Sequence, residues 1–457
     1  MNEAQELLFS QLNEALENKR YHQFTELLDR TNAVDIAEYL STLPTDHLLS
    51  VFRLLKKDVA ADIFAELDAD TREKIILTTT DTDLGTIVDQ LFVDDAVDLL
   101  EELPASMVKR ILRNVKPETR ILVNKFLQYP DGSAGSIMTA EYVDLKEGMT
   151  VTQAIERIRR TGVDKETIYV AYIIDNSRRL IGIVTLRDLL FADAGALLRD
   201  IMSTDIMMAK TTDDRESVTA MISKYGLLAL PIVDKEERLV GIVTVDDAMD
   251  VIEEEVTEDI EKMAAIVPDN RPYLKSSVFD IFKKRIPWLL LLMISATLTG
   301  EIISGFEAAL AHVPALVAFI PMLMDTGGNS GGQASVTVIR GLALGEISLR
   351  DILKVLWKEL RVGLLCGIIL CACNIVKIVL IDNLILQNNV SLAQALVVSL
   401  TLLFTVLVAK LVGCTLPLAA KRVGLDPAVM ASPFITTVVD AVSLIIYFRI
   451  AILILQI

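Results

Sequence analysis

The sequence predicts a multidomain membrane protein with an α-helical N-terminal domain, an α/β repeat pair, an acidic connecting helix and an all-α transmembrane domain of five spans. The first reason is that the mean hydropathy reaches +0.46 although 23% of the residues are charged. The second is segregation of charge: residues 1–275 carry 31 basic and 52 acidic side chains, whereas residues 276–457 carry 13 and 10. The third is an internal repeat of about sixty residues in the acidic part. The predicted domains span 1–130, 131–253, 254–285 and 286–457.

The composition excludes several classes of protein. A formal charge of −18 argues against nucleic acid as a partner, because phosphate backbones attract basic surfaces. The N-terminus is amphipathic and acidic, without a basic start before an apolar core, so we expect no signal peptide. The four cysteines lie in apolar runs and show no metal-ligand spacing with the three histidines. No nucleophile–base pair, phosphate loop or redox motif is found in the sequence, which therefore predicts no enzyme.

Residues 1–130 have the pattern of helices throughout, in recurring units where one helix ends and another begins. The breaks fall at Leu40–Pro44, Ala65–Asp68 and Leu99–Pro104. They predict a stack of short helices. Asp94, Asp95 and Asp98 place three carboxylates on about one helical turn. Two interpretations stay open for these carboxylates: a solvated acidic face, or part of a cation site shared with another acidic surface.

Residues 137–253 repeat a pattern of short β-branched strands and helices. Ile137-Met-Thr returns as Ile201-Met-Ser, and Leu180-Ile-Gly-Ile-Val-Thr-Leu-Arg-Asp188 returns as Leu239-Val-Gly-Ile-Val-Thr-Val-Asp-Asp247. One helix is expected in each copy, over 151–160 and 217–225. The doubled motif resembles a tandem pair of cystathionine-β-synthase (CBS) domains. That resemblance implies a module that senses small ligands, nucleotides or ions.

The segment 245–263 is predicted to be one amphipathic helix that leads toward the membrane. Its apolar stripe consists of Val245, Met249, Ile252, Val256 and Met263. The other faces carry nine carboxylates and one lysine before Pro268, so like charges repel along the helix. An acidic surface packed against this helix would need counter-cations, and divalent cations suit carboxylate ligands. Candidate partners are Glu216, Asp188 and Asp94–Asp98; the alternative is a solvated run of charge.

Five stretches of the last domain are long and apolar enough to cross a bilayer as helices. They cover 286–306, 313–340, 356–381, 391–418 and 428–456. Basic clusters precede the first span and lie between the second and third and between the fourth and fifth, whereas the other two connections carry no Lys or Arg. By the positive-inside rule, we expect a cytosolic N-terminus and a C-terminus on the outer side of the cell membrane.

Polar side chains inside the spans mark a candidate ion path, because such residues are costly in a bilayer. Asp440 lies in the last span, with Ser432 and Thr436 on the same helix face. This stripe suits a cation with oxygen ligands. The alternative is a structural ion pair between Asp440 and Lys410 of the fourth span.

The second span contains Pro321-Met-Leu-Met-Asp-Thr-Gly-Gly-Asn-Ser-Gly-Gly-Gln333. Its glycines allow close helix packing, and such segments are often packing seams only. Asn329 and Gln333 are four residues apart, so their carboxamides share a helix face and offer oxygen to a cation or its water. The two carboxamides favour an ion path here.

The order of the parts and three motifs resemble the MgtE family of magnesium channels and transporters over essentially the full chain. The motifs are Pro321…Gly327-Gly-Asn329…Gln333, Asp426-Pro…Pro433…Asp440 and Gly305-Phe-Glu307. The resemblance implies that Asp440 is the central ion-binding carboxylate of a pore at a dimer axis. The expected lining residues of that pore are Asn329, Gln333, Ser432, Thr436 and Glu307. The resemblance also implies a cytosolic magnesium sensor formed by Glu216, Asp247, Asp250, Glu255, Glu258 and Asp259.

The resemblance also implies a mechanism and partners. Mg²⁺ is then both transported and regulatory, and the protein is a homodimer in the cell membrane. At low cytosolic Mg²⁺ the acidic surfaces repel one another and the path opens; at high Mg²⁺ ions bridge them and the path closes. Binding of adenine nucleotide to the CBS pair stays open. So do two alternatives: a membrane-anchored CBS sensor that does not conduct, and a transporter of another divalent cation such as cobalt.

Two positions depart from the family pattern. Gly226 stands where a sensor aspartate is expected in the second CBS copy, which is expected to weaken one sensor site. Asp325 replaces a small residue before the glycines of the second span, and it is expected to add charge near the pore.

Overall fold

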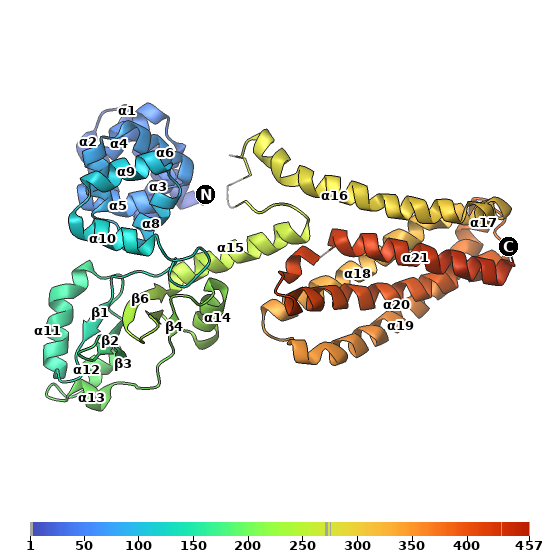
Figure 1. Ribbon diagram of the computed structural model, residues 1–457. Coiled ribbons are helices and arrows are strands. Elements are labelled where there is room, and N and C mark those ends of the chain that lie inside the picture. Colours follow the sequence, from blue (N-terminus) through green and yellow to red (C-terminus); the bar gives the residue numbers. More distant parts are fainter. Residues whose placement is uncertain (1–2, 270–272, 275, 431, 457) are drawn as a thin grey trace. The chain divides into compact units, whose positions relative to one another are not determined.

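The computed structural model describes residues 3–269, 273–274, 276–430 and 432–456. The chain divides into two compact units, Met1–Ile252 and Glu253–Ile457, whose elements are labelled in Figure 1. The first unit contains the N-terminal helices and the CBS pair, and the second contains the long apolar helices. Each unit has hydrophobic cores of its own, so each is described by itself.

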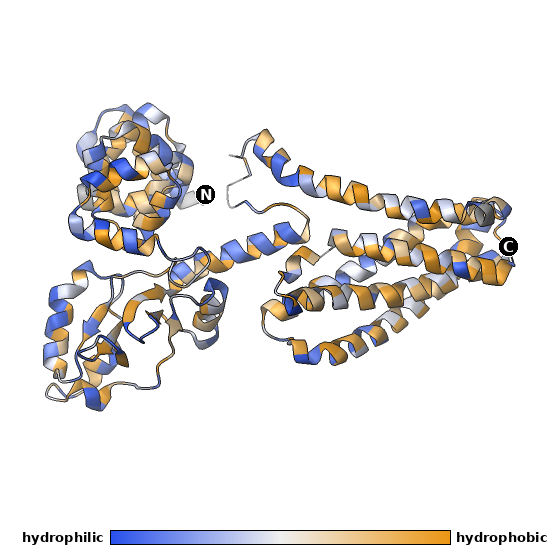
Figure 2. Cartoon of the chain, in the orientation of Figure 1, coloured by the Kyte–Doolittle hydropathy of each residue, from blue (hydrophilic) through white to orange (hydrophobic). Residues whose placement is uncertain are grey.

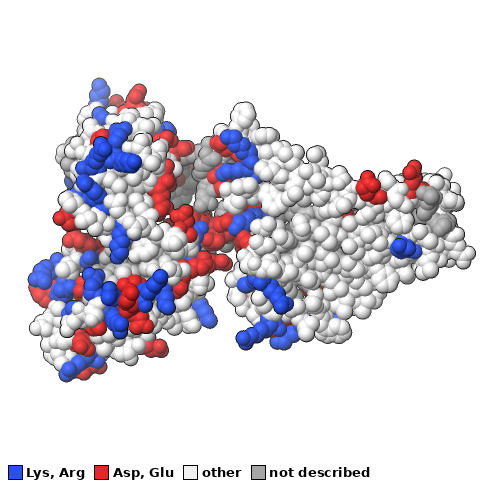
Figure 3. Space-filling model, in the orientation of Figure 1, with Lys and Arg blue, Asp and Glu red and all other residues white. Residues whose placement is uncertain are grey.

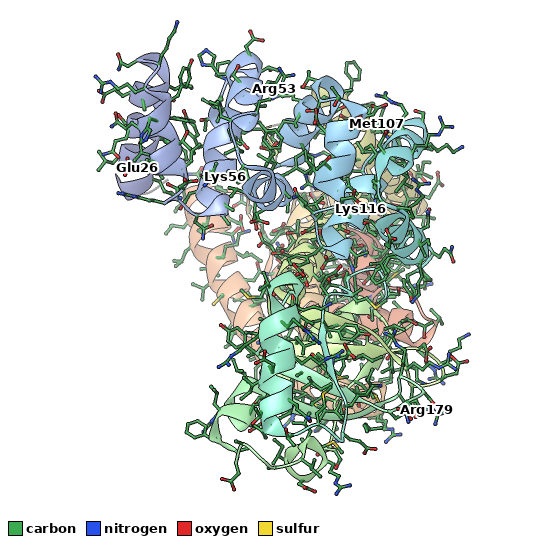
Figure 4. All side chains as sticks on the ribbon, turned by 90° about the vertical axis from the view of Figure 1, so that its left-hand side faces the viewer. Glu26, Arg53, Lys56, Met107, Lys116 and Arg179 are labelled. Carbon is green, nitrogen blue, oxygen red and sulfur yellow. The ribbon has the colours of Figure 1, made fainter. Side chains whose placement is uncertain are left out.

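The N-terminal domain is helical throughout, as the sequence predicts. Its described helices are α1 (Glu3–Glu17), α2 (Tyr21–Leu28), α3 (Ala33–Thr42), α4 (Thr45–Phe52), α5 (Lys57–Ala65), α6 (Ala69–Thr78), α7 (Asp81–Val88), α8 (Val93–Glu101), α9 (Ala105–Asn114) and α10 (Pro117–Phe126). Side-chain caps at Asn32, Asp68 and Thr80 accept backbone N–H groups and begin three of the helices. Lys56, seen in Figure 4, pairs with Asp29 at 3.0 Å.

Each CBS copy contributes one three-stranded sheet with the same topology. The strands are β1 (Val143–Leu145), β2 (Val170–Ile174), β3 (Leu180–Thr185), β4 (Ala209–Lys210), β5 (Ala229–Val233) and β6 (Leu239–Thr244). In both sheets the first pair is parallel and the second antiparallel. The helices are α11 (Val151–Thr161), α12 (Leu186–Phe191), α13 (Leu198–Ile201) and α14 (Arg215–Tyr225). The predicted helices over 151–160 and 217–225 are therefore confirmed.

The two CBS copies are interlocked through the repeated motifs. Thr139, which opens the first copy, exchanges backbone hydrogen bonds with Ile242 in β6 of the second, whereas Ser203 does so with Ile183 in β3 of the first. Met138 lies against Gly241, and Met202 against Gly182, so closely that a Cβ at either glycine would clash. The Ile-Met-Thr/Ser and Gly-Ile-Val motifs recur together because each packs against the other.

Helix α15 (Val245–Met263) has the predicted bounds, and the face that it buries is not its apolar stripe. Ala248 and Val251 are its buried residues, whereas Met249 is 65% exposed and Val256 is 53% exposed. The small Ala248 fits against the core of the first unit, which the larger apolar side chains of the predicted stripe do not enter. That stripe is largely exposed in the single chain.

The second unit is built from long apolar helices, which appear as orange ribbons in Figure 2. They are α16 (Val278–Gly305), the short α17 (Glu307–His312), α18 (Ile320–Ala343), α19 (Ile352–Lys377), α20 (Leu392–Arg422) and α21 (Ser432–Leu455). Among the described residues, four helical segments are long and apolar enough to cross a membrane: 278–305, 349–385, 392–422 and 427–455. Helix α18 coincides with the second predicted span, but its glycines and polar side chains keep it outside this group.

Candidate functional site

Carboxylates from α8 and α15 meet around a small cavity in the first unit. This cavity of about 200 Å³ is lined by Asp95, Asp98 and Glu102 from the N-terminal domain and by Asp250 from α15, with Arg72 at its wall. The structure thus brings together residues that the sequence predicts as partners although they are about 150 positions apart. Figure 3 shows many acidic and basic side chains on this unit, whereas most of the surface of the long helices carries no charge.

The cavity lies in an electrostatic environment that disfavours charged carboxylates. Loss of hydration, followed by the charge of Asp247, raises the pKa of Asp95 to about 6. Loss of hydration and the charge of Asp95 raise the pKa of Asp98 to about 7. Burial and the charges of Asp247, Asp95 and Glu166 also raise the pKa of Asp94 well above its usual range. A cation placed among these groups would offset both the repulsion and the lost hydration.

Asp247 and Asp188 occupy equivalent positions of the two CBS copies, and each accepts a hydrogen bond from the threonine three residues before it. Asp188 accepts hydrogen bonds from the Thr185 hydroxyl at 2.6 Å and from the Thr185 backbone N–H at 3.0 Å, which caps α12. Asp247 accepts from the Thr244 hydroxyl in the same way. Only Asp247 also acts on the acidic cavity, because burial and its neighbours raise its pKa and its charge reaches Asp94 and Asp95.

Helix α14 carries Glu216 in its first turn, exposed to solvent. The helix ends at Gly226, whose backbone is left-handed at φ 61°. A glycine adopts this helix-terminating conformation without the strain that an aspartate would experience. The glycine at position 226, where the family pattern has an aspartate, is therefore explained by the backbone conformation that ends α14.

The far end of α15 carries three predicted sensor residues, Glu255, Glu258 and Asp259, next to a lysine that sequence reasoning left unassigned. Lys262 donates to Asp426 at 2.7 Å and pairs with Glu258. Partial burial, and then the charge of Asp426, raise the pKa of Asp259. Because Asp426 also caps the turn Pro427–Met430 before α21 through the Ala428 N–H at 2.8 Å, the acidic helix is bonded to the entrance of the last span.

The pore candidates lie on two helices that pack tightly against each other. On α18, a Cβ added at Gly328 would come within 2.8 Å of the Thr436 Cγ2 on α21. Asn329 and Gln333 are exposed, although most residues around them on α18 are buried. Asp440 is half-buried on α21, and the carboxylate of Asp325 acts on it electrostatically.

Lys410 does not pair with Asp440. Its ammonium group lies 3.9 Å from Glu359 of α19, and both side chains are largely buried, with 7% and 14% exposed. The alternative of a structural Asp440–Lys410 pair is therefore wrong for this structure. Among the described residues, the carboxylate of Asp325 is the charged group that acts on Asp440.

Two further lining residues are predicted, Glu307 and Ser432. Glu307 begins α17 and is exposed. Ser432 begins α21, but its side chain lies outside the described residues.

Several acidic residues near the cavity escaped the sequence reasoning. Asp62 of α5 and Glu66, which follows the last residue of α5, act on Asp95, and Glu166 acts on Asp94. Burial and the charges of Asp247 and Asp246 raise the pKa of Glu166 to about 7. The four-residue spacing of Asp62 and Glu66 was a usable signal, whereas Glu166 lies in an irregular connection with no pattern. In the described part of the chain, no three His, Cys, Asp or Glu side chains are arranged to hold a metal ion.

Comparison with known proteins matches each part of the chain. The model of a divalent cation transporter, MgtE, matches residues 320–450; that of the MgtE intracellular N domain matches 31–132; and the CBS domain matches 134–195 and 198–254. The chain is 36% identical to the magnesium transporter MgtE of Thermus thermophilus, with 99% of both chains covered. It is 31% identical to that of Bacillus subtilis, with 95% of both covered.

Two solved structures resemble the first part of the chain. The soluble part of a magnesium transporter aligns with TM-score 0.53 and 30% identity, covering 55% of this chain and 99% of that one. The cytosolic domain of the Mg²⁺ channel MgtE in complex with ATP aligns with TM-score 0.51 and 35% identity, covering 53% and 99%.

Proposed function

The chain belongs to the MgtE family of magnesium transporters, and from this premise we propose that Mg²⁺ crosses the membrane along the polar faces of α18 and α21. Asp440 is the carboxylate at which the ion pauses. Because Mg²⁺ gives up its water reluctantly, the ion keeps several waters, and the oxygens of Thr436, Asn329 and Gln333 accept hydrogen bonds from them. Ser432 and Glu307 stay candidates for the same path.

The exposed polar face of α18 is the observation that carries this proposal. In the single chain Asp325, Asn329 and Gln333 are exposed, although α18 is otherwise packed against α20 and α21. A stripe of this kind would be costly against lipid, so it belongs next to water or protein. A second copy related by a twofold axis would enclose the stripe in a pore, so the transporter is a homodimer.

Five membrane spans and a cytosolic N-terminus complete the proposed topology. Helix α18 supplies the second span, and its polar residues are explained by its place at the pore. The absence of Lys and Arg from the connections between spans one and two and between spans three and four supports this orientation.

Cytosolic Mg²⁺ closes this path by binding among the acidic side chains. The cavity carboxylates Asp95, Asp98 and Asp250, together with Asp94, Asp247 and Glu216, form one part of the sensor. Glu255, Glu258 and Asp259 form the other. The raised pKa values of Asp95, Asp98 and Asp259 support the idea, because carboxylates that lose hydration and repel each other in the folded chain are stabilised by a bound cation.

The CBS pair is also the proposed site for adenine nucleotide. Its support is the 35% identity to a cytosolic domain that was solved with ATP. The interlocked CBS sheets of this chain lie in the part that aligns with that domain.

Replacement of Asp440 by asparagine tests the pore. Asp440→Asn keeps the shape of the side chain but removes the charge that holds a divalent ion, so Mg²⁺ uptake into proteoliposomes should fall to near background. The matched control is Glu346→Gln, which removes one exposed carboxylate from the loop after α18. Full uptake by a well-folded Asp440→Asn protein would overturn the proposed pore.

A further inference from the structure

The polar residues of α18 and α21 lie at matched levels across the contact between the two helices. The contacts of the α18 glycines define the register: Gly327 faces Val439 and Ser443, Gly328 faces Thr436, and Gly331 faces Ile435. As residue numbers rise along α18 they fall along α21, so the helices are antiparallel.

This register places Asp325 level with Asp440. Gly328 lies against Thr436; three residues back along α18 is Asp325, and four residues onward along the antiparallel α21 is Asp440. The two carboxylates are also close enough for the charge of Asp325 to act on Asp440. One turn further along, four residues away on each helix, Asn329 is level with Thr436, which faces the adjacent Gly328. Four residues correspond to about 6 Å of rise along a helix.

Asp325 is oriented by a neighbour on its own helix. The Asn329 Nδ2 donates to the Asp325 Oδ1 at 3.1 Å, across one turn of α18. This bond leaves the other carboxylate oxygen for water or a cation, on the exposed face of the helix.

We propose that Asp325 is a second ion-binding carboxylate of the pore, which acts with Asp440 on the same hydrated divalent cation. The inference rests on the proposed function, since it assumes that the face shared by α18 and α21 is the ion path. Two negative charges at one level attract a divalent cation more strongly than a monovalent one, because the Coulomb energy scales with the charge of the ion. Asp325 thereby determines the affinity for divalent ions and the discrimination against monovalent ones.

The test is Mg²⁺ uptake by the full-length protein in proteoliposomes, measured over a range of Mg²⁺ concentrations. Asp325→Asn keeps an oxygen that accepts from Asn329 but removes the charge. The concentration for half-maximal uptake should rise about tenfold, the size of the interaction in water between a unit charge and a divalent ion about 6 Å away. Inhibition of this uptake by Na⁺ should appear at the same time. Asp325→Glu, which keeps the charge, should remain within about threefold of the parent.

Three outcomes separate this inference from its alternatives. If Asp325→Asn behaves like the parent while Asp325→Ala is impaired, Asp325 only holds Asn329 in place and the charge hypothesis is overturned. If both variants match the parent and the Glu346→Gln control, Asp325 has no part in ion binding. If Asp440→Asn keeps full uptake, the proposed pore itself fails, whatever the Asp325 variants do.

Discussion

At the scale of single residues, the folded first unit favours the protonated state of several carboxyl groups. Asp95, Asp98 and Glu166 have pKa values raised to about 6 or 7, against about 4 for such groups in an unfolded chain. Their protonated forms are favoured by the fold. Without cations, the contribution of these three carboxylates to the stability of the fold is therefore greatest below about pH 4 and is lost as the pH rises through about 7.

A pH dependence of Mg²⁺ binding follows from these residues. Protons compete with the ion at pH 6 but much less at pH 8, since binding requires ionised carboxylates. The Mg²⁺ concentration that gives half-maximal protection of the full chain from protease should therefore be roughly tenfold higher at pH 6 than at pH 8. Digestion of an unstructured peptide at both pH values corrects for the activity of the protease. Equal concentrations at the two pH values would mean that these carboxylates do not bind the ion.

At the scale of elements, α15 links both parts of the proposed sensor, because one helix carries Asp247, Asp250, Glu255 and Asp259. Replacing these four with the corresponding amides should remove the repulsion and the ion ligands together. Protection from protease by Mg²⁺ should then weaken or vanish. The matched control removes four charges from exposed positions: Glu73→Gln, Glu118→Gln, Glu147→Gln and Glu156→Gln. If the α15 variant is protected at the same Mg²⁺ concentration as this control, the helix is not the sensor.

The same helix shows what the sequence could and could not predict. Its bounds followed from continuous helical periodicity, which is a local signal. The face that it buries did not follow from the sequence, because Ala248 packs into a core assembled from distant segments. The sequence likewise indicated Asp440 as costly in a bilayer, but it could not choose between Lys410 and other partners. Glu359 lies about fifty positions before Lys410, and only the packing of α19 on α20 brings them together.

At the scale of the whole molecule, the exposed surfaces of the single chain point to a second copy. The polar stripe of α18 and the exposed Met249 and Val256 of α15 are faces that the described chain leaves uncovered. We expect a homodimer in detergent, with a mass by light scattering twice that of the 50.4 kDa chain after correction for detergent. A strictly monomeric protein that still transports Mg²⁺ would contradict both the dimer and the position of the pore.

The interlocked CBS copies have a consequence for how this chain can be divided. The last strand of each copy forms backbone hydrogen bonds with a segment of the other copy. Ile242 bonds with Thr139, and Ile183 bonds with Ser203. A fragment that contains one copy therefore exposes a sheet edge and an uncovered glycine where a methionine should lie. Cut in the linker 196–197 between the two matched CBS segments, the protein would yield two pieces that are each incomplete but complementary. We therefore expect the two CBS copies to fold as one unit. The two fragments should recover their structure when mixed, and neither should do so alone.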